Sequence, residues 1–160
     1  MKGNFVRTLL WFGVALAASM LPLQAEASRC STAMTSGNWD YTYTGTILTP
    51  TGAVPAASVG HYFQDATGKI TGGQSRSVAG ASGVEDITGT VNVNKDCTAT
   101  GTINVVVNGQ VLRTAELDLV YDSNRNHVRM IFRSLTLPDG TNVPVVLTID
   151  GSRVFIKNDN

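Results

Sequence analysis

Hydrophobic and polar residues alternate along most of this chain, and the alternation is clearest over residues 37–47. Trp39, Tyr41, Tyr43 and Ile47 share one parity, while the other parity carries an aspartate and three threonines. A period of two, with aromatic and β-branched residues, predicts a β-strand with one buried face. Three large rings on one face require a curved sheet that can close over them.

The rest of the chain predicts that sheet. Further segments of similar length follow, separated by glycine, proline and polar residues, and none sustains a helical period. We expect nine strands, at about residues 38–48, 57–64, 69–78, 84–93, 98–107, 110–121, 126–137, 142–149 and 152–157. A meander of this length must close or stack to hide its edges. The predicted fold is therefore all-β, a single antiparallel meander β-barrel of about eight to nine strands.

Two hairpins test this prediction. A hairpin closed between Asp122 and Arg125 would place Leu117 opposite Met130 on the buried face. The same register places acidic residues of one strand beside arginines of the next on the outer face. A random pairing of two strands would rarely bring apolar residues together on one face and opposite charges together on the other.

The dipeptide Asn108-Gly109 is the strongest short hairpin signal in the chain. A simple two-residue turn would put Ile103 on the face of the acidic residues. We therefore expect a three-residue loop with a bulge, which places Ile103 opposite Ala115 on the buried face. This register leaves Arg113 facing inward.

Residues 1–27 predict a secretory signal peptide. A basic region with Lys2 and Arg7 precedes the apolar run at residues 9–18, and the small-residue pattern Ala25-Glu26-Ala27 offers a cleavage site. The apolar run is shorter than the roughly 20 residues of a membrane span. An uncleaved anchor is the alternative.

Residues 28–160 are then expected to form one β-barrel domain, secreted or periplasmic. Basic and acidic residues balance, with 12 of each in the whole chain. Nucleic acid and anionic membranes need a basic stripe, so we expect neither as a partner. No later stretch is long and apolar enough to insert into a membrane.

Cys30 and Cys97 are the two cysteines. An even count in an exported chain favours a disulfide, which would close a loop of about 67 residues. A lipid on Cys30 is the alternative, and the arginine immediately before it argues against one.

Two resemblances follow from short motifs. Gly37-Asn38-Trp39 resembles the Gly-x-Trp opening of lipocalin-like (calycin) barrels, in which a basic residue near the final strand packs over the tryptophan; Arg153 is placed suitably. Residues 54–60, 67–72 and 87–102 resemble a group of small exported bacterial proteins of unknown function, thought to form calycin-like or allene-oxide-cyclase-like β-barrels. This second resemblance spans the whole mature domain. It implies the fold and export, and no established activity.

No motif indicates a catalytic centre, a metal site or a cofactor, so we expect none of these. His61 is the best single candidate for chemistry. It shares parity with Val59 and Phe63, so it could point into the barrel as a base or hydrogen-bond donor; the alternative is a solvated histidine on the rim or surface. Glu85 and Asp86 are adjacent and face opposite sides of a strand, so they cannot form an acid–base pair by themselves.

The candidate ligand-binding residues are Trp39, Tyr41, Tyr43, His61 and Phe63. They could line a pocket for a small apolar ligand or fill the barrel, and we favour filling. One hypothesis is a non-catalytic exported barrel that binds a small apolar ligand or an envelope partner. A second is a cyclase- or isomerase-type enzyme that uses His61 and a tyrosine in the barrel mouth. A third is a purely structural or surface-interaction protein with a filled barrel. The first is preferred because the inward parity carries almost no ionisable residues.

Overall fold

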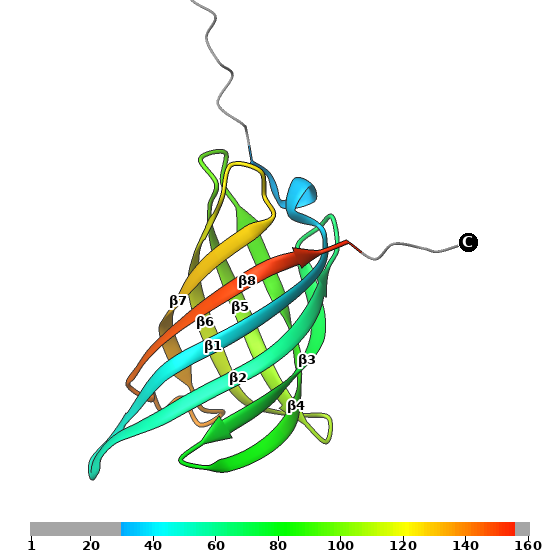
Figure 1. Cartoon of the computed structure of the whole chain (residues 1–160). Helices are drawn as coiled ribbons and strands as arrows, with labels where there is room; N and C mark the ends of the chain where they lie inside the picture. Colours follow the sequence, from blue (N-terminus) through cyan, green and yellow to red (C-terminus); the bar gives the residue numbers. More distant parts are fainter. Residues whose placement is uncertain (1–29, 156–160) are drawn as a thin grey trace, which may run out of the picture.

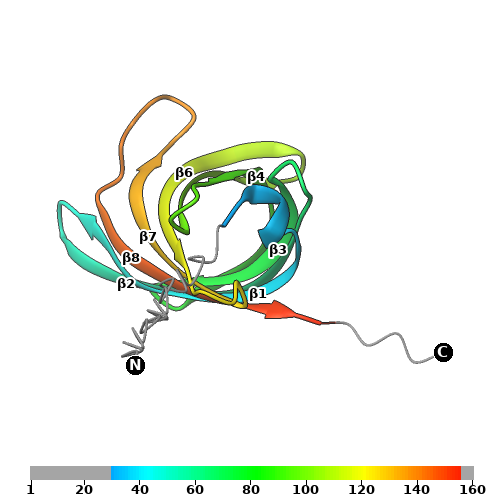
Figure 2. The ribbon, with the colours of Figure 1, turned by 90° about the horizontal axis from the view of Figure 1, so that it is seen from above.

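The computed structural model describes residues 30–155, and within them eight antiparallel strands form a closed barrel (Figures 1 and 2). Each strand pairs with its neighbour in the chain, and β1 pairs with β8 to close the sheet. The strands are β1 (Gly37–Thr49), β2 (Gly52–Gln64), β3 (Lys69–Val78), β4 (Ala81–Val93), β5 (Thr98–Val107), β6 (Gln110–Tyr121), β7 (His127–Thr136) and β8 (Val145–Val154). The all-β antiparallel meander barrel is confirmed. The expected signal peptide, residues 1–27, lies outside the described residues.

The alternation along β1 places its aromatic residues inside the barrel. Trp39, Tyr41 and Tyr43 are 0%, 7% and 6% exposed, while the residues between them face solvent. Apolar residues of the other seven strands complete one continuous core around these rings. Within residues 30–155, no helix combines the length and the apolar character needed to cross a membrane.

The expected turn at Asp150-Gly151 is wrong, and this removes one of the nine predicted strands. β8 runs through both residues, with Gly151 opposite Tyr41. A Cβ on Gly151 would lie 2.9 Å from Cγ1 of Val128, so the glycine serves close packing of β7 against β8. β2 also begins earlier than expected, so only Pro50 and Thr51 separate it from β1.

The β5–β6 hairpin has a two-residue turn instead of the expected three-residue loop. Asn108 and Gly109 adopt left-handed conformations, with φ of 51° and 78°, as this type of hairpin turn requires. The bulge lies inside the ladder, between Val105 and Val106. The bulge shifts the pairing of β5 with β6 by one residue, so Ile103 lies opposite Ala115, as predicted.

The β6–β7 hairpin differs from the predicted register by two residues. Leu117 lies opposite Phe132, where Met130 was expected. From Leu117 to the turn, a shift of two leaves every side chain on the predicted face. A bulge between Glu116 and Leu117 then reverses the parity of β7, so Leu135 is buried opposite Ala115, contrary to the predicted alternation. On the outer face Arg133 binds Glu116 at 3.0 Å, an exposed ion pair that contributes little to stability.

One end of the barrel is closed by the chain that precedes β1. The 3-10 helix η1 (Thr32–Thr35) covers this end, and Trp39 donates a hydrogen bond from Nε1 to the carbonyl of Thr35 at 3.0 Å. The Nε2 of Gln64, itself fully buried, donates to Oγ1 of Thr35 at 2.8 Å. The expected disulfide between Cys30 and Cys97 is confirmed, and it ties this segment to the β4–β5 turn.

Arg153 lies at the same end, opposite Trp39 in the β1–β8 ladder. Its guanidinium donates to the carbonyls of Met34, at 3.4 Å, and Ser36. A Cβ on Gly37 would lie 3.1 Å from this guanidinium, so a glycine leaves room for the arginine. The calycin resemblance itself stays a prediction.

The opposite end, called the mouth below, is formed by residues 50–51, 79–80, 108–109 and 137–144. There β7 and β8 separate, because their ladder extends only from His127↔Ser152 to Ile131↔Thr148. Figure 2 shows the connection between β7 and β8 extending outward from the barrel.

Candidate functional site

The barrel interior contains a cavity of about 210 Å³. All eight strands contribute to its lining, for example through Tyr41, Tyr62, Ile70, Ile87, Ile103, Leu117, Phe132 and Leu147. The cavity reaches solvent at the mouth, because Leu137 and the side chain of Arg76, both in its lining, are 37% and 30% exposed. The expectation of a filled interior is therefore wrong.

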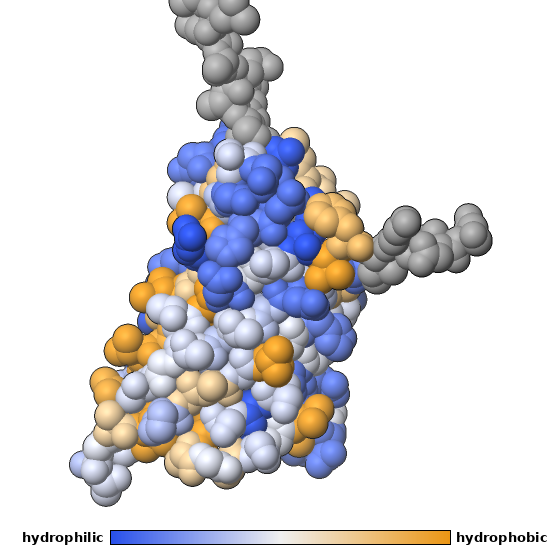
Figure 3. Space-filling model, viewed as in Figure 1, coloured by the Kyte–Doolittle hydropathy of each residue, from blue (hydrophilic) through white to orange (hydrophobic). Residues whose placement is uncertain are grey.

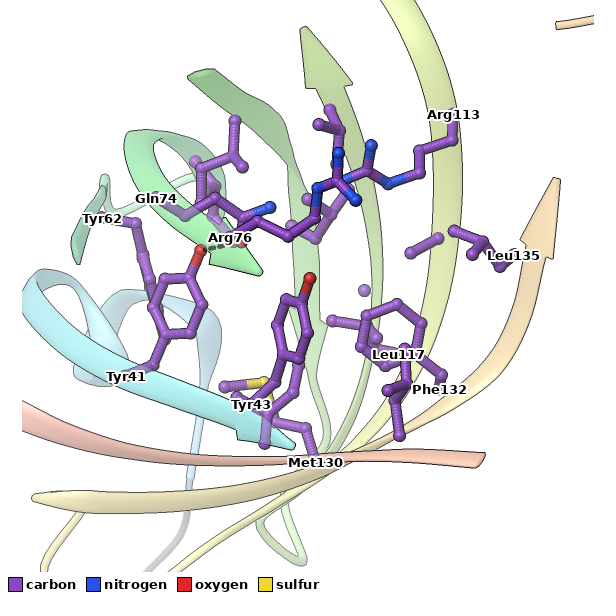
Figure 4. A pocket seen from close by; sticks show the side chains of 18 of the residues that line it. Tyr41, Tyr43, Tyr62, Gln74, Arg76, Arg113, Leu117, Met130, Phe132 and Leu135 are labelled. Atoms are coloured by element: carbon purple, nitrogen blue, oxygen red, sulfur yellow. Dashed lines mark hydrogen bonds between the residues drawn. The ribbon is translucent and has the colours of Figure 1, made fainter. Parts of the chain in front are cut away.

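Two tyrosines of β1 stand in the cavity wall with their hydroxyl groups directed toward Gln74 and the arginines of the opposite wall (Figure 4). The Tyr41 hydroxyl donates to Oε1 of Gln74 at 2.8 Å. The ring of Tyr43 packs edge-on against Phe132, with centroids 6.0 Å apart. Burial raises the pKa of both tyrosines, so both hydroxyls are neutral hydrogen-bond donors at physiological pH.

A carboxylate lies inside the barrel next to this wall. Glu85 of β4 is 4% exposed, and Arg113 of β6 binds it through both terminal nitrogens, with Nη1–Oε1 at 2.9 Å. Arg76 of β3 donates from Nε to the same Oε1 at 2.8 Å. Burial alone would raise the pKa of Glu85, but the hydrogen bonds from Arg113 and Gln74 outweigh it and hold the pKa below its usual value. Glu85 is therefore ionised at neutral pH.

Gln74 joins the tyrosine side to the carboxylate side. Its Oε1 accepts hydrogen bonds from Tyr41 and from Ser58, the latter at 3.1 Å. Its Nε2 donates to Oε2 of Glu85 at 2.8 Å. One hydrogen-bonded network therefore spans the interior, with members on β1, β2, β3, β4 and β6, and it fixes the orientation of the side chains around the cavity.

Only some of the sequence-predicted site residues line this cavity. Tyr41 and Tyr43 do. Trp39 lies deeper, at the closed end, where it stacks on Tyr62 with ring centroids 6.2 Å apart and meets Tyr121 edge-on at 5.6 Å. It supports the cavity from behind without lining it.

His61 and Phe63 are not in the cavity. Both lie on the outer face of β2, and Phe63 is 48% exposed. The β1–β2 register explains this, because His61 is the partner of Asp40, which faces solvent. Apolar residues occupy both faces of β2, so its parity could not be assigned from sequence. The hypothesis of an inward catalytic His61 is wrong.

Sequence reasoning missed Gln74, Arg76 and Glu85. The expectation that the inward parity carries almost no ionisable residues is wrong for this reason. A signal was available, since Glu85 shares parity with Ile87, which is buried, and Arg113 was already expected to face inward without a partner. Within residues 30–155, no three His, Cys, Asp or Glu side chains lie together in a way that could hold a metal ion.

Comparisons with known proteins describe the fold only. No protein family and no curated protein matches the chain. Among solved structures, the redesigned β-barrel mFAP1 bound to DFHBI is 20% identical, with 77% of this chain and 100% of that chain covered and a TM-score of 0.49. The S-type phycobiliprotein lyase CPES from Guillardia theta is 10% identical, with 82% and 97% covered and a TM-score of 0.43. At these values neither similarity bears on the function of this chain.

Proposed function

We propose that this chain is an exported, non-catalytic protein that binds a small, largely apolar molecule inside its barrel. The observation that supports this most directly is the cavity of about 210 Å³, which is lined mainly by aliphatic and aromatic side chains and reaches solvent at the mouth. A dry apolar cavity of about 150 Å³ can bind benzene. The size therefore suits a single ring with a short substituent, or an aliphatic chain of similar volume.

The outer surface supports access from the mouth. Figure 3 shows hydrophilic side chains gathered over the end that carries η1 and more hydrophobic ones toward the other end. Leu48 and Val146, near the mouth, are 45% and 59% exposed. An apolar molecule that contacts such a rim has lost part of its hydration before it enters the cavity.

The disulfide supports export. A bond such as Cys30–Cys97 persists in an oxidising, non-cytoplasmic environment. Together with the signal peptide predicted at residues 1–27, it favours a secreted or periplasmic protein.

Binding can be tested by calorimetry and thermal unfolding with neutral probes of graded size. Toluene should bind and raise the melting temperature in a saturable manner, whereas anthracene should not, because three fused rings exceed the cavity. Trp39 is the only tryptophan outside the predicted signal peptide, so its fluorescence reports on the closed end during the titration.

Two variants of β6 provide the matched comparison. Ala115 lines the cavity, so Ala115→Phe should fill it and abolish toluene binding. Val120 is 57% exposed on the outer face, so Val120→Phe should leave binding unchanged. Circular dichroism is the control that both variants fold. If Ala115→Phe does not fold, Ala115→Leu takes its place. Toluene binding that survives the filled cavity would contradict the proposal.

A further inference from the structure

The charged groups at the cavity do not balance. Both Arg76 and Arg113 line it, and within residues 30–155 no aspartate or glutamate does. The single carboxylate of the cluster, Glu85, lies behind them and accepts hydrogen bonds from both guanidinium groups. Because two positive groups share one negative group, the wall facing the cavity carries one formal positive charge in excess.

The two arginines differ in the donors that they have left. Arg113 uses both terminal nitrogens on Glu85, whereas Arg76 uses only Nε. The two terminal amino groups of Arg76 make no hydrogen bond to the described part of the chain, and its side chain is 30% exposed toward the mouth. A guanidinium edge of this kind matches the two oxygens of a carboxylate.

Tyr43 offers a further donor on the other side of the cavity. Its hydroxyl makes no hydrogen bond to residues 30–155, in contrast to that of Tyr41, which donates to Gln74. Figure 4 shows the Tyr43 hydroxyl directed toward the region that Arg76 and Arg113 occupy. Beyond this region, toward the closed end, the cavity wall is mainly apolar and includes Met130 together with Tyr62 and Tyr121.

We propose that the molecule bound in the cavity is a small monocarboxylate with an apolar body. Its carboxylate lies toward the mouth, bound by the terminal amino groups of Arg76 and the hydroxyl of Tyr43, and its body extends toward Tyr62. One negative charge matches the one excess positive charge. A phosphate monoester, with about −1.5 to −2 charges, would exceed it. This inference rests on the proposed function and adds the chemical class of the ligand.

The test compares probes that share one ring and differ in charge. Benzoate, benzyl alcohol and benzylamine carry charges of −1, 0 and +1 at pH 7, and their affinities are measured by calorimetry at low ionic strength. Benzoate should bind at least about tenfold more tightly than benzyl alcohol, since hydrogen bonds to a charged group are stronger than neutral ones. Benzylamine should bind most weakly. Hexanoate, hexanol and hexylamine repeat the comparison with an aliphatic body.

Variants of Arg76 locate the effect. Arg76→Met should lower the affinity for benzoate to that for benzyl alcohol and leave the latter unchanged. Glu85 retains Arg113 and Gln74 as partners in this variant, so the fold should persist, which circular dichroism checks. Arg76→Lys keeps the charge and should keep most of the preference. Tyr43→Phe should reduce benzoate affinity by a smaller factor, since it removes one neutral donor.

The outcomes separate this inference from the proposed function. Equal affinity for benzoate and benzyl alcohol, or a preference for benzylamine, would overturn the assignment of an anion while ligand binding itself stands. A preference for benzoate that persists in Arg76→Met would also overturn it. Failure of every probe, neutral and charged, would instead refute the proposed function.

Discussion

The ring of Tyr41 lies directly against Gly60, its partner in the β1–β2 ladder. A Cβ on Gly60 would lie 2.7 Å from both Cζ and the hydroxyl oxygen of Tyr41, and 2.6 Å from the carbonyl oxygen of Gly73. The absence of a side chain at this inward position therefore allows the tyrosine to reach across β2 to Gln74 on β3. The cavity wall depends on this glycine as much as on the tyrosine.

We expect Gly60→Ala to displace Tyr41 and to lower the free energy of unfolding by about 1–3 kcal/mol, the usual cost of overpacking. Urea unfolding followed by circular dichroism measures this. Gly83→Ala is the control, because a Cβ at Gly83 meets no atom within 4 Å. Equal effects of the two substitutions would show that the contact with Tyr41 is not what limits position 60.

Trp39 has no exposed surface and stacks on Tyr62. Replacement by alanine should cost about 3–5 kcal/mol of folding free energy, as for other buried aromatic residues. Circular dichroism is the appropriate probe, since the variant lacks the reporting tryptophan. A loss below about 1 kcal/mol would be incompatible with the buried position of this ring.

The stability of the barrel should decrease in acid through Glu85. Its pKa in the folded state is lowered from the usual 4.5, so its contribution to stability is fully present above that pH. The contribution is lost as the pH falls through the lower, folded-state pKa. Unfolding free energies measured between pH 7 and pH 3 should show this loss.

Glu85→Gln isolates the effect. At pH 7 we expect it to cost about 2–3 kcal/mol, because both arginines lose their anionic partner. The difference from the wild-type protein should shrink toward pH 3. Asp65, Asp96 and Asp139 also have lowered pKa values, through hydrogen bonds in turns, but they are present in both proteins and cancel. A difference that is constant with pH would contradict the assignment of the effect to Glu85.

Mass spectrometry of the exported protein tests the predicted processing. The chain should begin near Ser28, and its mass should be two hydrogens below that of the reduced form because of the Cys30–Cys97 bond. Reduction should lower the free energy of unfolding by up to about 4 kcal/mol, the estimate for a loop of this length. A retained Met1 or a lipid on Cys30 would refute the processing.

His61→Ala should leave stability within about 0.5 kcal/mol of wild type, because surface substitutions away from special features have small effects. His61 lies on the outer face of β2, so toluene and benzoate affinities should also be unchanged. Calorimetry checks both. A large loss of affinity would mean that ligands bind outside the barrel.

The sequence predicts the fold well because strand parity and turn residues are local properties. β1 shows this most clearly, since its polar and apolar residues alternate and its inward rings are those expected. Prediction failed where a local signal is overridden by packing between strands. Asp150-Gly151 has the composition of a turn, but the contact of Gly151 with Val128, a tertiary feature, keeps the strand continuous.

The candidate site was predictable only in part. Tyr41 and Tyr43 follow from β1, whereas His61 was placed inside because β2 has apolar residues on both faces. The grouping of side chains around Glu85 was missed because its members lie on different strands. Gln74 and Arg76 are on β3, Glu85 is on β4 and Arg113 is on β6. Their proximity depends on barrel closure and on the bulge at Val105, neither of which a single strand pattern determines.

The arrangement of the strand ends has a practical consequence for tethering. β1 begins and β8 ends at the closed end, as the pairing of Asn38 with Val154 shows, and both ends of the described chain leave from there (Figure 1). A tag, fusion partner or solid support joined next to Cys30, after the predicted signal peptide, or just after Phe155 would therefore lie at the closed end, away from the mouth. Attachment at either of these points should leave ligand access unobstructed.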